Sequence, residues 1–242
     1  IATALDLLEA GKQVLLLDRD EEAVFGGLAR ESFGGMFFVD SPEQRRQGIR
    51  DSADLALRDW RSFAEFGAGD IWPRAWAEAY VNRCTAEVRD WVSGHGVTFL
   101  PVTNWVERGE FRPGNSVPRF HMVWGTGQGL ADKLIAALRG HRNAGRLTMR
   151  FGHRVERLVM QNGRAAGAEG VEEKTGAPFE ARADVVVVAS GGINGDLDRV
   201  RQNWHKDWRT PPETILNGSH RFADGRVHDA VAAAGGALTH LD

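Results

Sequence analysis

The stretch QVLLLDRDEEAVFGGLARESFGGMFFVD, residues 13–40, decides the fold that this sequence predicts. Val14 to Leu17 form a short apolar run, typical of a parallel β-strand covered on both faces. The run ends at Asp18, and a carboxylate in that position of an open parallel sheet binds the ribose hydroxyls of a dinucleotide. The glycine pairs Gly26-Gly27 and Gly34-Gly35 follow, and paired glycines let backbone N–H groups approach a pyrophosphate or a flat ring. The stretch therefore predicts a dinucleotide site in an α/β fold.

The composition excludes several classes of protein. The 242 residues, 42% of them hydrophobic, suffice for one large α/β domain, or one domain and part of another. The net charge of −3 gives no global field that would attract nucleic acid or anionic lipid. The single cysteine, Cys84, excludes a disulfide framework and a cysteine-rich metal site, and fits a reducing cytoplasm. No apolar run is long enough to span a membrane. We expect a cytoplasmic protein that acts on a small molecule and holds no metal.

The opening residues IATALDLLEAG have the apolar spacing of a helix that ends at Gly11. In a βαβ unit, a strand and a GxGxxG turn precede this helix, and the acidic residue follows the glycines by about 20 residues. Because Asp18 occupies that acidic position, the turn is expected immediately before Ile1. We infer that the first strand and its phosphate loop have been cut away, and that the chain is truncated at Asp242 as well.

The middle of the chain predicts helices followed by a long loop. Ser41 is a good N-cap and Pro42 suits the first helical position. Residues 72–91 carry tryptophans at helical spacing, and we expect these to pack in the core. Residues 94–119 are rich in turn formers, as long functional loops are.

Residues 123–140, VWGTGQGLADKLIAALRG, begin a new unit with three glycines before an amphipathic helix. The N–H groups at a helix start favour polar ligand atoms, so Gly125, Gly127 and Gly129 predict a ligand-facing turn.

The rest of the chain predicts a hairpin, a strand and a final helix. Two strand-like runs around Asn162-Gly163 indicate the hairpin. The run VVVVA, residues 185–189, predicts a second buried strand, which ends near Gly191-Gly192. After Ile193 the sequence is polar, until a helix begins near Gly225 and ends at Gly235-Gly236.

Taken in order, these segments resemble the FAD-binding subunits of the fumarate reductase and succinate dehydrogenase flavoprotein family, which also contains the 3-ketosteroid dehydrogenases. The series is a helix, VLLLD, GGLARESFGG, GTGQGL before a helix, HRVERLVMQNGRAAGAEG and ADVVVVASGG, and it covers nearly the whole chain. The resemblance implies a Rossmann-like FAD-binding domain over residues 1–192 that lacks its first strand and GxGxxG turn. Residues 193–242 would begin a capping domain over the substrate.

The resemblance also implies which residues contact FAD. Asp18 would bind the ribose of the AMP half, and the pyrophosphate would lie along Gly26, Gly27 and Ala29. The flavin would lie against Ser32, Gly34 and Gly35, the adenine against the backbone of Val155, and the adenosine beside Ala189, Gly191 and Gly192. Leu28 stands where many relatives have Asn, so a side-chain contact is lost there. The stretch lacks the histidine that attaches FAD in some relatives, which implies non-covalent FAD.

In this family the flavin performs the hydride chemistry, while the protein positions the substrate and moves a proton. Arg119 and His121 are the catalytic candidates, because Arg holds a carboxylate or carbonyl in a forked geometry and His exchanges a proton near neutral pH. A surface Arg and a structural His fit the sequence equally well. His220 and Asp224 are further candidates. Tyr80 is the single tyrosine and lies in a helix of core character, so these residues do not favour tyrosine-based steroid chemistry.

The sequence thus predicts an FAD-dependent oxidoreductase that acts on a carbon–carbon single or double bond next to an electron-withdrawing group. Its electron donor or acceptor is not specified. One alternative is an NAD-dependent Rossmann dehydrogenase, which would show regular alternation of strands and helices after Asp18. The other is a non-catalytic nucleotide-binding remnant, since a chain without its phosphate loop would bind no cofactor.

Overall fold

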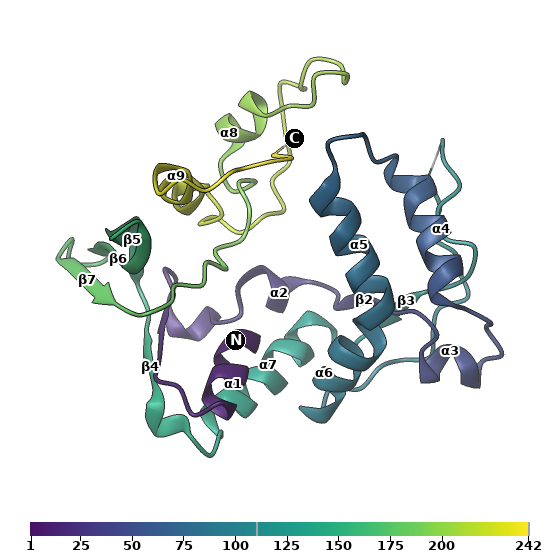
Figure 1. The fold of residues 1–242 in the computed structure, drawn as a ribbon, viewed down its shortest axis with the longest axis horizontal. Coiled ribbons are helices and arrows are strands. Elements are labelled where there is room, and N and C mark those ends of the chain that lie inside the picture. Colours follow the sequence, from purple (N-terminus) through teal and green to yellow (C-terminus); the bar gives the residue numbers. More distant parts are fainter. Residues whose placement is uncertain (110, 242) are drawn as a thin grey trace. The chain divides into compact units, whose positions relative to one another are not determined.

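A computed structural model describes residues 1–109 and 111–241 of the chain (Figure 1). The chain forms two compact units: Ile1–Leu5 with Ala29–Arg142, and Asp6–Leu28 with Asn143–Asp242. Each unit contains helices and strands, which confirms the mixed α/β class.

The elements are short and alternate irregularly. The helices are α1 (Ala2–Glu9), α2 (Gly27–Glu31), α3 (Pro42–Arg46), α4 (Ala53–Ala64), α5 (Ile71–Arg83), α6 (Asp90–Gly94), α7 (Thr126–Arg139), α8 (Leu197–Gln202) and α9 (Arg226–Ala233). The strands are β1 (Val14–Leu17), β2 (Gly35–Phe37), β3 (Phe120–Met122), β4 (Leu147–Arg150), β5 (His153–Gln161), β6 (Arg164–Glu172) and β7 (Pro178–Arg182). A π-helical turn, Cys84–Arg89, joins α5 to α6.

The strand predicted after the opening helix is confirmed as β1. It pairs in parallel with β4, with Val14 opposite Leu147 and Leu17 opposite Arg150. The opening helix α1 ends as predicted, since Gly11 has φ +70° and its N–H bonds to the carbonyl of Leu8. Leu15 remains 39% exposed, so this strand is not covered on both faces by the described residues.

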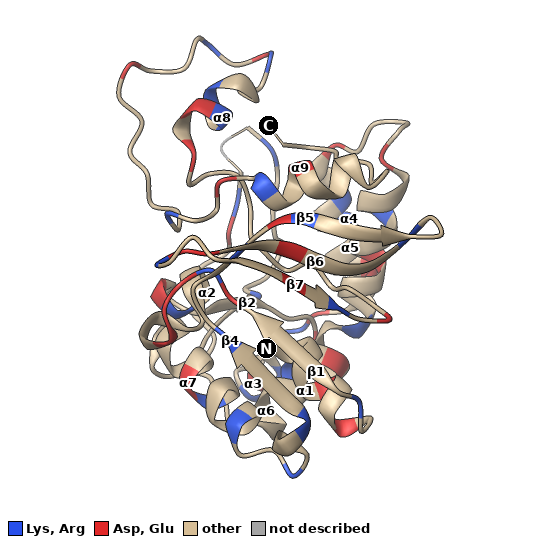
Figure 2. Ribbon diagram, turned by 90° about the vertical axis from the view of Figure 1, so that its left-hand side faces the viewer, with Lys and Arg blue, Asp and Glu red and all other residues tan. Residues whose placement is uncertain are grey.

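The predicted hairpin is also confirmed, as strands β5 and β6 of a three-stranded antiparallel sheet with β7 (Figure 2). Asn162 and Gly163 connect them with φ values of +51° and +75°. Two consecutive positive φ angles define the type I′ turn that matches the twist of paired strands.

The second buried strand, predicted at residues 185–189, is wrong. Val185 is 70% exposed and Val187 is 56% exposed. Their β-branched side chains favour an extended backbone, but a strand also needs a neighbour to bond with. Nothing in the described parts of the chain forms a ladder with this run.

Helix α3 begins as predicted. The Ser41 side chain accepts a hydrogen bond from Gln44 N at 3.0 Å, and the Gln44 side chain accepts one from Ser41 N at 2.8 Å. This reciprocal pair is a capping box.

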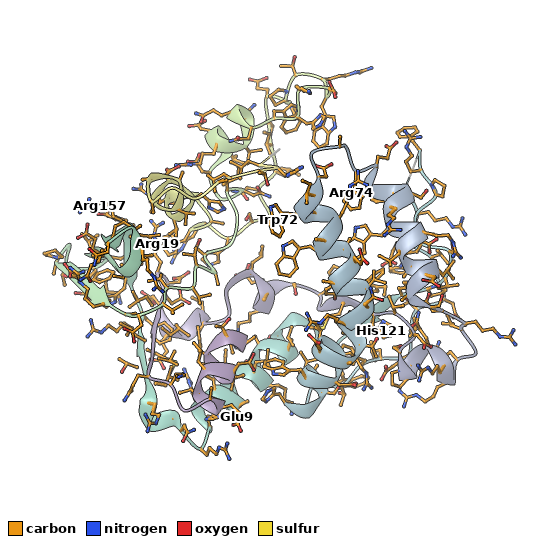
Figure 3. All side chains as sticks on the ribbon, viewed as in Figure 1. Glu9, Arg19, Trp72, Arg74, His121 and Arg157 are labelled. Carbon is orange, nitrogen blue, oxygen red and sulfur yellow. The ribbon has the colours of Figure 1, made fainter. Side chains whose placement is uncertain are left out.

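The core prediction for the tryptophans is wrong at two positions. Trp72 and Trp76 are 75% and 73% exposed, and Figure 3 shows Trp72 projecting from α5 on the side away from α4. Helix α5 carries apolar side chains on all of its faces, so the periodicity of the sequence does not indicate which face is buried. The small residues Ala77 and Val81 face the interior instead, whereas Trp91 packs against buried valines as predicted.

The final helix is confirmed as α9, which follows Gly225 at φ +78° and ends before Gly235. The short helix α8 was not predicted; Asp196 caps it through its side chain. Across the described residues, no helix has the length and apolar character needed to cross a membrane.

Candidate functional site

Asp18 lies at the carboxyl end of β1, as predicted, and its backbone is held on both sides. Asp18 N donates to the carbonyl of Arg150 in β4, and its carbonyl accepts from His153 N at the start of β5. Within the described residues, the carboxylate accepts one hydrogen bond, from Asp20 N to Oδ1 at 2.9 Å. The second carboxylate oxygen is therefore available to a ligand.

The two residues after Asp18 are engaged in ion pairs. Arg19, labelled in Figure 3, pairs with Glu173 and with Asp224, the latter at 2.7 Å. Asp20 pairs with Arg221 at 2.9 Å, and its Oδ2 lies 3.1 Å from Nε2 of His220. Sequence reasoning gave Arg19 and Asp20 no role, since their partners lie about 150 to 200 residues away in the chain.

Burial acts to raise the pKa of Asp20, but hydrogen bonds from the Glu21 N–H and the Arg221 guanidinium outweigh it and hold the pKa below its ordinary value. His220 and Asp224, predicted as further catalytic candidates, thus anchor the loop before α9 to the end of β1.

The predicted cofactor glycines differ in the space beside them. A Cβ atom built on Gly27 or Gly192 would meet no atom within 4 Å, and one on Gly191 would meet only Ala223 Cβ at 4.0 Å. Gly26, Gly27 and Gly191 have φ values of +111°, +51° and +80°. Gly27, Gly191 and Gly192 therefore border open space, and the positive φ angles of Gly26, Gly27 and Gly191 suit contact with a pyrophosphate or sugar.

The glycines predicted to face the flavin have close protein neighbours. A Cβ atom on Gly34 would lie 2.7 Å from the carbonyl carbon of Thr126, and one on Gly35 would lie 2.0 Å from the Phe120 ring. Gly35 also pairs with Met122 across β2 and β3. Packing within the protein therefore requires glycine here, and the contact of Gly34 and Gly35 with flavin stays a prediction.

Ser32 is the turn residue between α2 and β2. Its hydroxyl donates to the carbonyl of Ala29 at 2.8 Å and accepts from Gly34 N at 3.2 Å. The side chain therefore shapes the turn, and the Ser32 carbonyl accepts a hydrogen bond from Gly127 N at 2.8 Å.

The glycines before α7 are not all ligand-facing. The helix begins at Thr126, so Gly127 and Gly129 lie inside it, and Gly127 is buried. A Cβ atom on Gly127 would lie 2.0 Å from the carbonyl oxygen of Ala29. Gly127 thus faces the α2–β2 segment, and its predicted ligand-facing role is wrong.

The remaining predicted cofactor residues lie in the second unit. Val155 is half-buried in β5, opposite Gly170 of β6. Ala189 is exposed in the irregular run before Gly191. No contact within the protein assigns either residue to the adenosine, and these roles stay predictions.

Arg119 is fully buried, next to β3, at the centre of a charged network. Its Nε and Nη2 donate to the two oxygens of Asp51, both at 2.7 Å, and its Nη1 donates to Asp59 at 2.6 Å and to Asn115 Oδ1 at 2.8 Å. Burial acts to lower the pKa of Arg119, but the two carboxylates outweigh it and raise the pKa. These contacts hold Arg119 as a structural ion pair.

His121 is also fully buried, in β3. Its Nδ1 lies 2.7 Å from the carbonyl oxygen of Arg119, an acceptor, so Nδ1 carries the proton. Its Nε2, 2.6 Å from Ser41 Oγ, therefore accepts from the hydroxyl. Burial lowers the pKa of His121 below its ordinary value, which favours the neutral ring. A substrate would have to replace these partners, and the catalytic role of Arg119 and His121 stays a prediction.

Tyr80 is unsuited to proton abstraction. Its hydroxyl donates to the carbonyl of Phe37 at 2.9 Å, and burial raises the pKa of Tyr80 to about 12.

An acidic side chain that ends a parallel strand, with positive-φ glycines bordering open space, is typical of dinucleotide-binding proteins. The whole chain matches one family of this class. Residues 1–242 match the FAD binding domain family, and the chain belongs to it. FAD is therefore the cofactor, and the NAD alternative is not supported.

Relatives in sequence and structure agree with this assignment. A KsdD-like steroid dehydrogenase of Mycobacterium tuberculosis is 41% identical over 100% of this chain and 45% of its own length. A 3-ketosteroid-Δ4-(5α)-dehydrogenase of Rhodococcus jostii has a similar fold, with a TM-score of 0.76 at 20% identity over 100% of this chain and 52% of that protein. A flavocytochrome c3 fumarate reductase gives a TM-score of 0.69 at 17% identity, over 96% of this chain and 43% of that protein. The chain thus spans about half the length of the curated relatives that it matches.

The residues present fit FAD. Asp18 keeps a carboxylate oxygen for a ribose hydroxyl, and the backbone at Gly27, Gly191 and Gly192 borders open space.

Proposed function

We propose that this protein is an FAD-dependent oxidoreductase that acts on a carbon–carbon single or double bond next to an electron-withdrawing group. The match of the whole chain to the FAD binding domain family carries the proposal. The names of the relatives support the bond type, because a 3-ketosteroid and fumarate both place a carbon–carbon bond beside a carbonyl carbon.

The proposed substrate is a small molecule of the steroid type. The support is the 41% identity to a KsdD-like steroid dehydrogenase over this entire chain. Tyr80 takes no part in the proposed proton transfer, because its hydroxyl is bonded to Phe37 and its pKa is raised to about 12. Arg119 or His121 would serve only in a conformation that releases Asp51 or Ser41.

FAD supplies hydride transfer when bound. We propose that Asp18 accepts hydrogen bonds from the ribose of the AMP half and that the N–H groups of Gly26 and Gly27 bind the pyrophosphate. Val155, Ala189, Gly191 and Gly192 would bound the adenosine.

The proposed domain division is an FAD-binding domain over residues 1–192, Rossmann-like in its connections, and the start of a capping domain over residues 193–242. The proposal also includes action in the cytoplasm with an electron partner still to be identified. The buried free thiol of Cys84 fits a reducing compartment.

The test is the absorption spectrum of the purified full-length protein, before and after incubation with FAD. A flavin spectrum that 3-ketosteroids change under anaerobic conditions, and that dicarboxylates and enoyl compounds leave unchanged, supports both the function and the substrate class. A colourless protein that takes up no FAD refutes the function. A flavoprotein that responds only to dicarboxylates refutes the steroid class alone.

A further inference from the structure

The segment from Ala29 to Gly35 is fastened to the turn between β3 and α7, residues Val123–Gly127. Gly127 N donates to the carbonyl of Ser32 at 2.8 Å, and Val123 N donates to the carbonyl of Gly34 at 3.0 Å. These are main-chain bonds, so they fix the backbone of the segment whatever its side chains are.

The same two pieces of backbone interlock sterically. A Cβ atom on Gly127 would lie 2.0 Å from the carbonyl oxygen of Ala29 and 2.4 Å from Ser32 Oγ. A Cβ atom on Gly34 would in turn lie 2.8 Å from Gly127 N. Both contacts are shorter than a real Cβ atom tolerates, so neither glycine admits a side chain unless the backbone moves.

An ion pair and a ring contact reinforce this arrangement. Arg30 of α2 pairs with Asp132 of α7 at 2.8 Å. The rings of Phe33 and Phe120 lie 5.4 Å apart. The segment is therefore held at several points along its length.

Thr126 holds the turn in an unusual conformation. Its φ is +63°, next to Gly125 at +88°. A β-branched residue adopts the left-handed region only where its surroundings impose it, and such residues cluster at functional sites. The Thr126 hydroxyl donates to the carbonyl of Gly125 at 2.6 Å. Gly125 and Thr126 thus give the turn its shape at the point where the Thr126 backbone contacts Gly34.

We propose that Gly127 is a positioning residue for the flavin ring. This inference rests on the proposed function and on the predicted contact between the flavin and the backbone of Ser32, Gly34 and Gly35. Gly127 fixes that backbone through its N–H group and its lack of a side chain, with Thr126 holding the turn. The environment of the flavin ring then depends on residues 126 and 127, whereas binding of the AMP half depends on Asp18.

The first test compares Gly127→Ala with Gly94→Ala. Gly94 is a matched control, because it ends α6 and a Cβ atom there would meet nothing within 4 Å. Gly127→Ala is expected to weaken FAD binding at least about tenfold, shift the visible band of the bound flavin, and leave the Kd for AMP unchanged. Gly94→Ala is expected to change none of the three. Equal weakening of AMP and FAD would show a general loss of structure and overturn the proposal.

The second variant, Thr126→Gly, covers failure of Gly127→Ala to fold. It adds no atom and removes the unfavourable φ, so the thermal midpoint of the FAD-free protein is not expected to fall. The turn gains freedom, and FAD is still expected to bind more weakly with a shifted visible band. A wild-type protein without FAD refutes the proposed function. A wild-type flavoprotein in which both variants match Gly94→Ala refutes only the role of Gly127.

Discussion

Replacement of Arg119 by methionine is expected to destabilise the protein strongly. The side chain is fully buried and donates four hydrogen bonds, two to Asp51, one to Asp59 and one to Asn115. Methionine fills similar space but leaves two buried carboxylates without their cation. Removing one partner of a buried ion pair costs about 3–5 kcal/mol, because the remaining charge is uncompensated.

Other hydrogen-bond donors still contact Asp51 and Asp59 in the variant, so the expected loss of stability lies near the lower end of this range. Gln44 Nε2 still donates to Asp51 at 3.0 Å, and Ser116 donates to Asp59 through its N–H and its hydroxyl at 2.7 and 2.6 Å. We therefore expect a loss of about 3 kcal/mol in the free energy of unfolding at neutral pH. With an m-value of about 3 kcal/mol/M, the urea midpoint falls by about 1 M.

The loss is expected to depend on pH in a defined direction. Burial acts to raise the pKa of Asp59, but bonds from Ser116 and Arg119 outweigh it and hold the pKa below its ordinary value. In the wild type, this carboxylate therefore stabilises the fold above its unfolded pKa of about 3.9, and the stabilisation is lost as the pH falls through the folded pKa. Acid also neutralises the charges that Arg119→Met leaves unpaired. The difference in stability between variant and wild type should thus be largest near neutral pH and shrink toward about pH 4.

The assay is urea unfolding followed by tryptophan fluorescence, at neutral and acidic pH. Arg119→Lys serves as a control, since it keeps the charge but cannot form the fork on Asp51 while bonding Asp59, and it should lose less stability. The triple variant Asp51→Asn, Asp59→Asn, Arg119→Met removes all three charges and should recover part of the loss. An Arg119→Met protein with the wild-type urea midpoint and no activity would refute this reasoning and make Arg119 a catalytic group.

Three further outcomes are expected. The wild type should lose stability as the pH falls below about 6.5, because burial lowers the pKa of His121 and makes the neutral ring the stable form. His121→Gln should lose less stability over the same pH range, which urea unfolding at several pH values measures. Gly170→Ala should destabilise the protein by about 1–3 kcal/mol in thermal unfolding, since its Cβ atom would lie 1.9 Å from the carbonyl oxygen of Arg154, and Gly145→Ala, with open space around it, should not. Asp18→Ala should weaken FAD binding roughly 10- to 100-fold in fluorescence titrations. In the FAD-free protein it should lower the thermal midpoint less than Asp20→Asn does, because Asp18 accepts one hydrogen bond within the protein, whereas Asp20 pairs with Arg221 and contacts His220.

Sequence reasoning succeeded where the cause of a structure is local. The capping box at Ser41, the turn at Asn162-Gly163 and the end of α1 at Gly11 each depend on a few adjacent residues. The family was also predictable, because an ordered series of short motifs over the whole chain is specific even though each motif is modest.

Sequence reasoning failed where the cause is tertiary. The network of Arg119 joins residues 60 and 68 positions away, and no local pattern indicates such partners. The exposure of Trp72 depends on which face of an apolar helix finds a neighbour. The valines at residues 185–188 have the composition of a strand, but composition does not supply a pairing partner.

The glycines of residues 13–40 show why motif and role have to be separated. Glycine at Gly27 leaves open space beside a positive-φ backbone, whereas glycine at Gly34 lets the chain touch the start of α7. Both look identical in the sequence, yet an added methyl group would enter open space at the first and meet the protein itself at the second. Alanine at position 27 should therefore act first on the cofactor, and alanine at position 34 should act first on the fold. Both glycines have a positive φ, so alanine adds a similar backbone strain at either position. A difference between the effects of the two substitutions is therefore due to the atoms that surround each glycine.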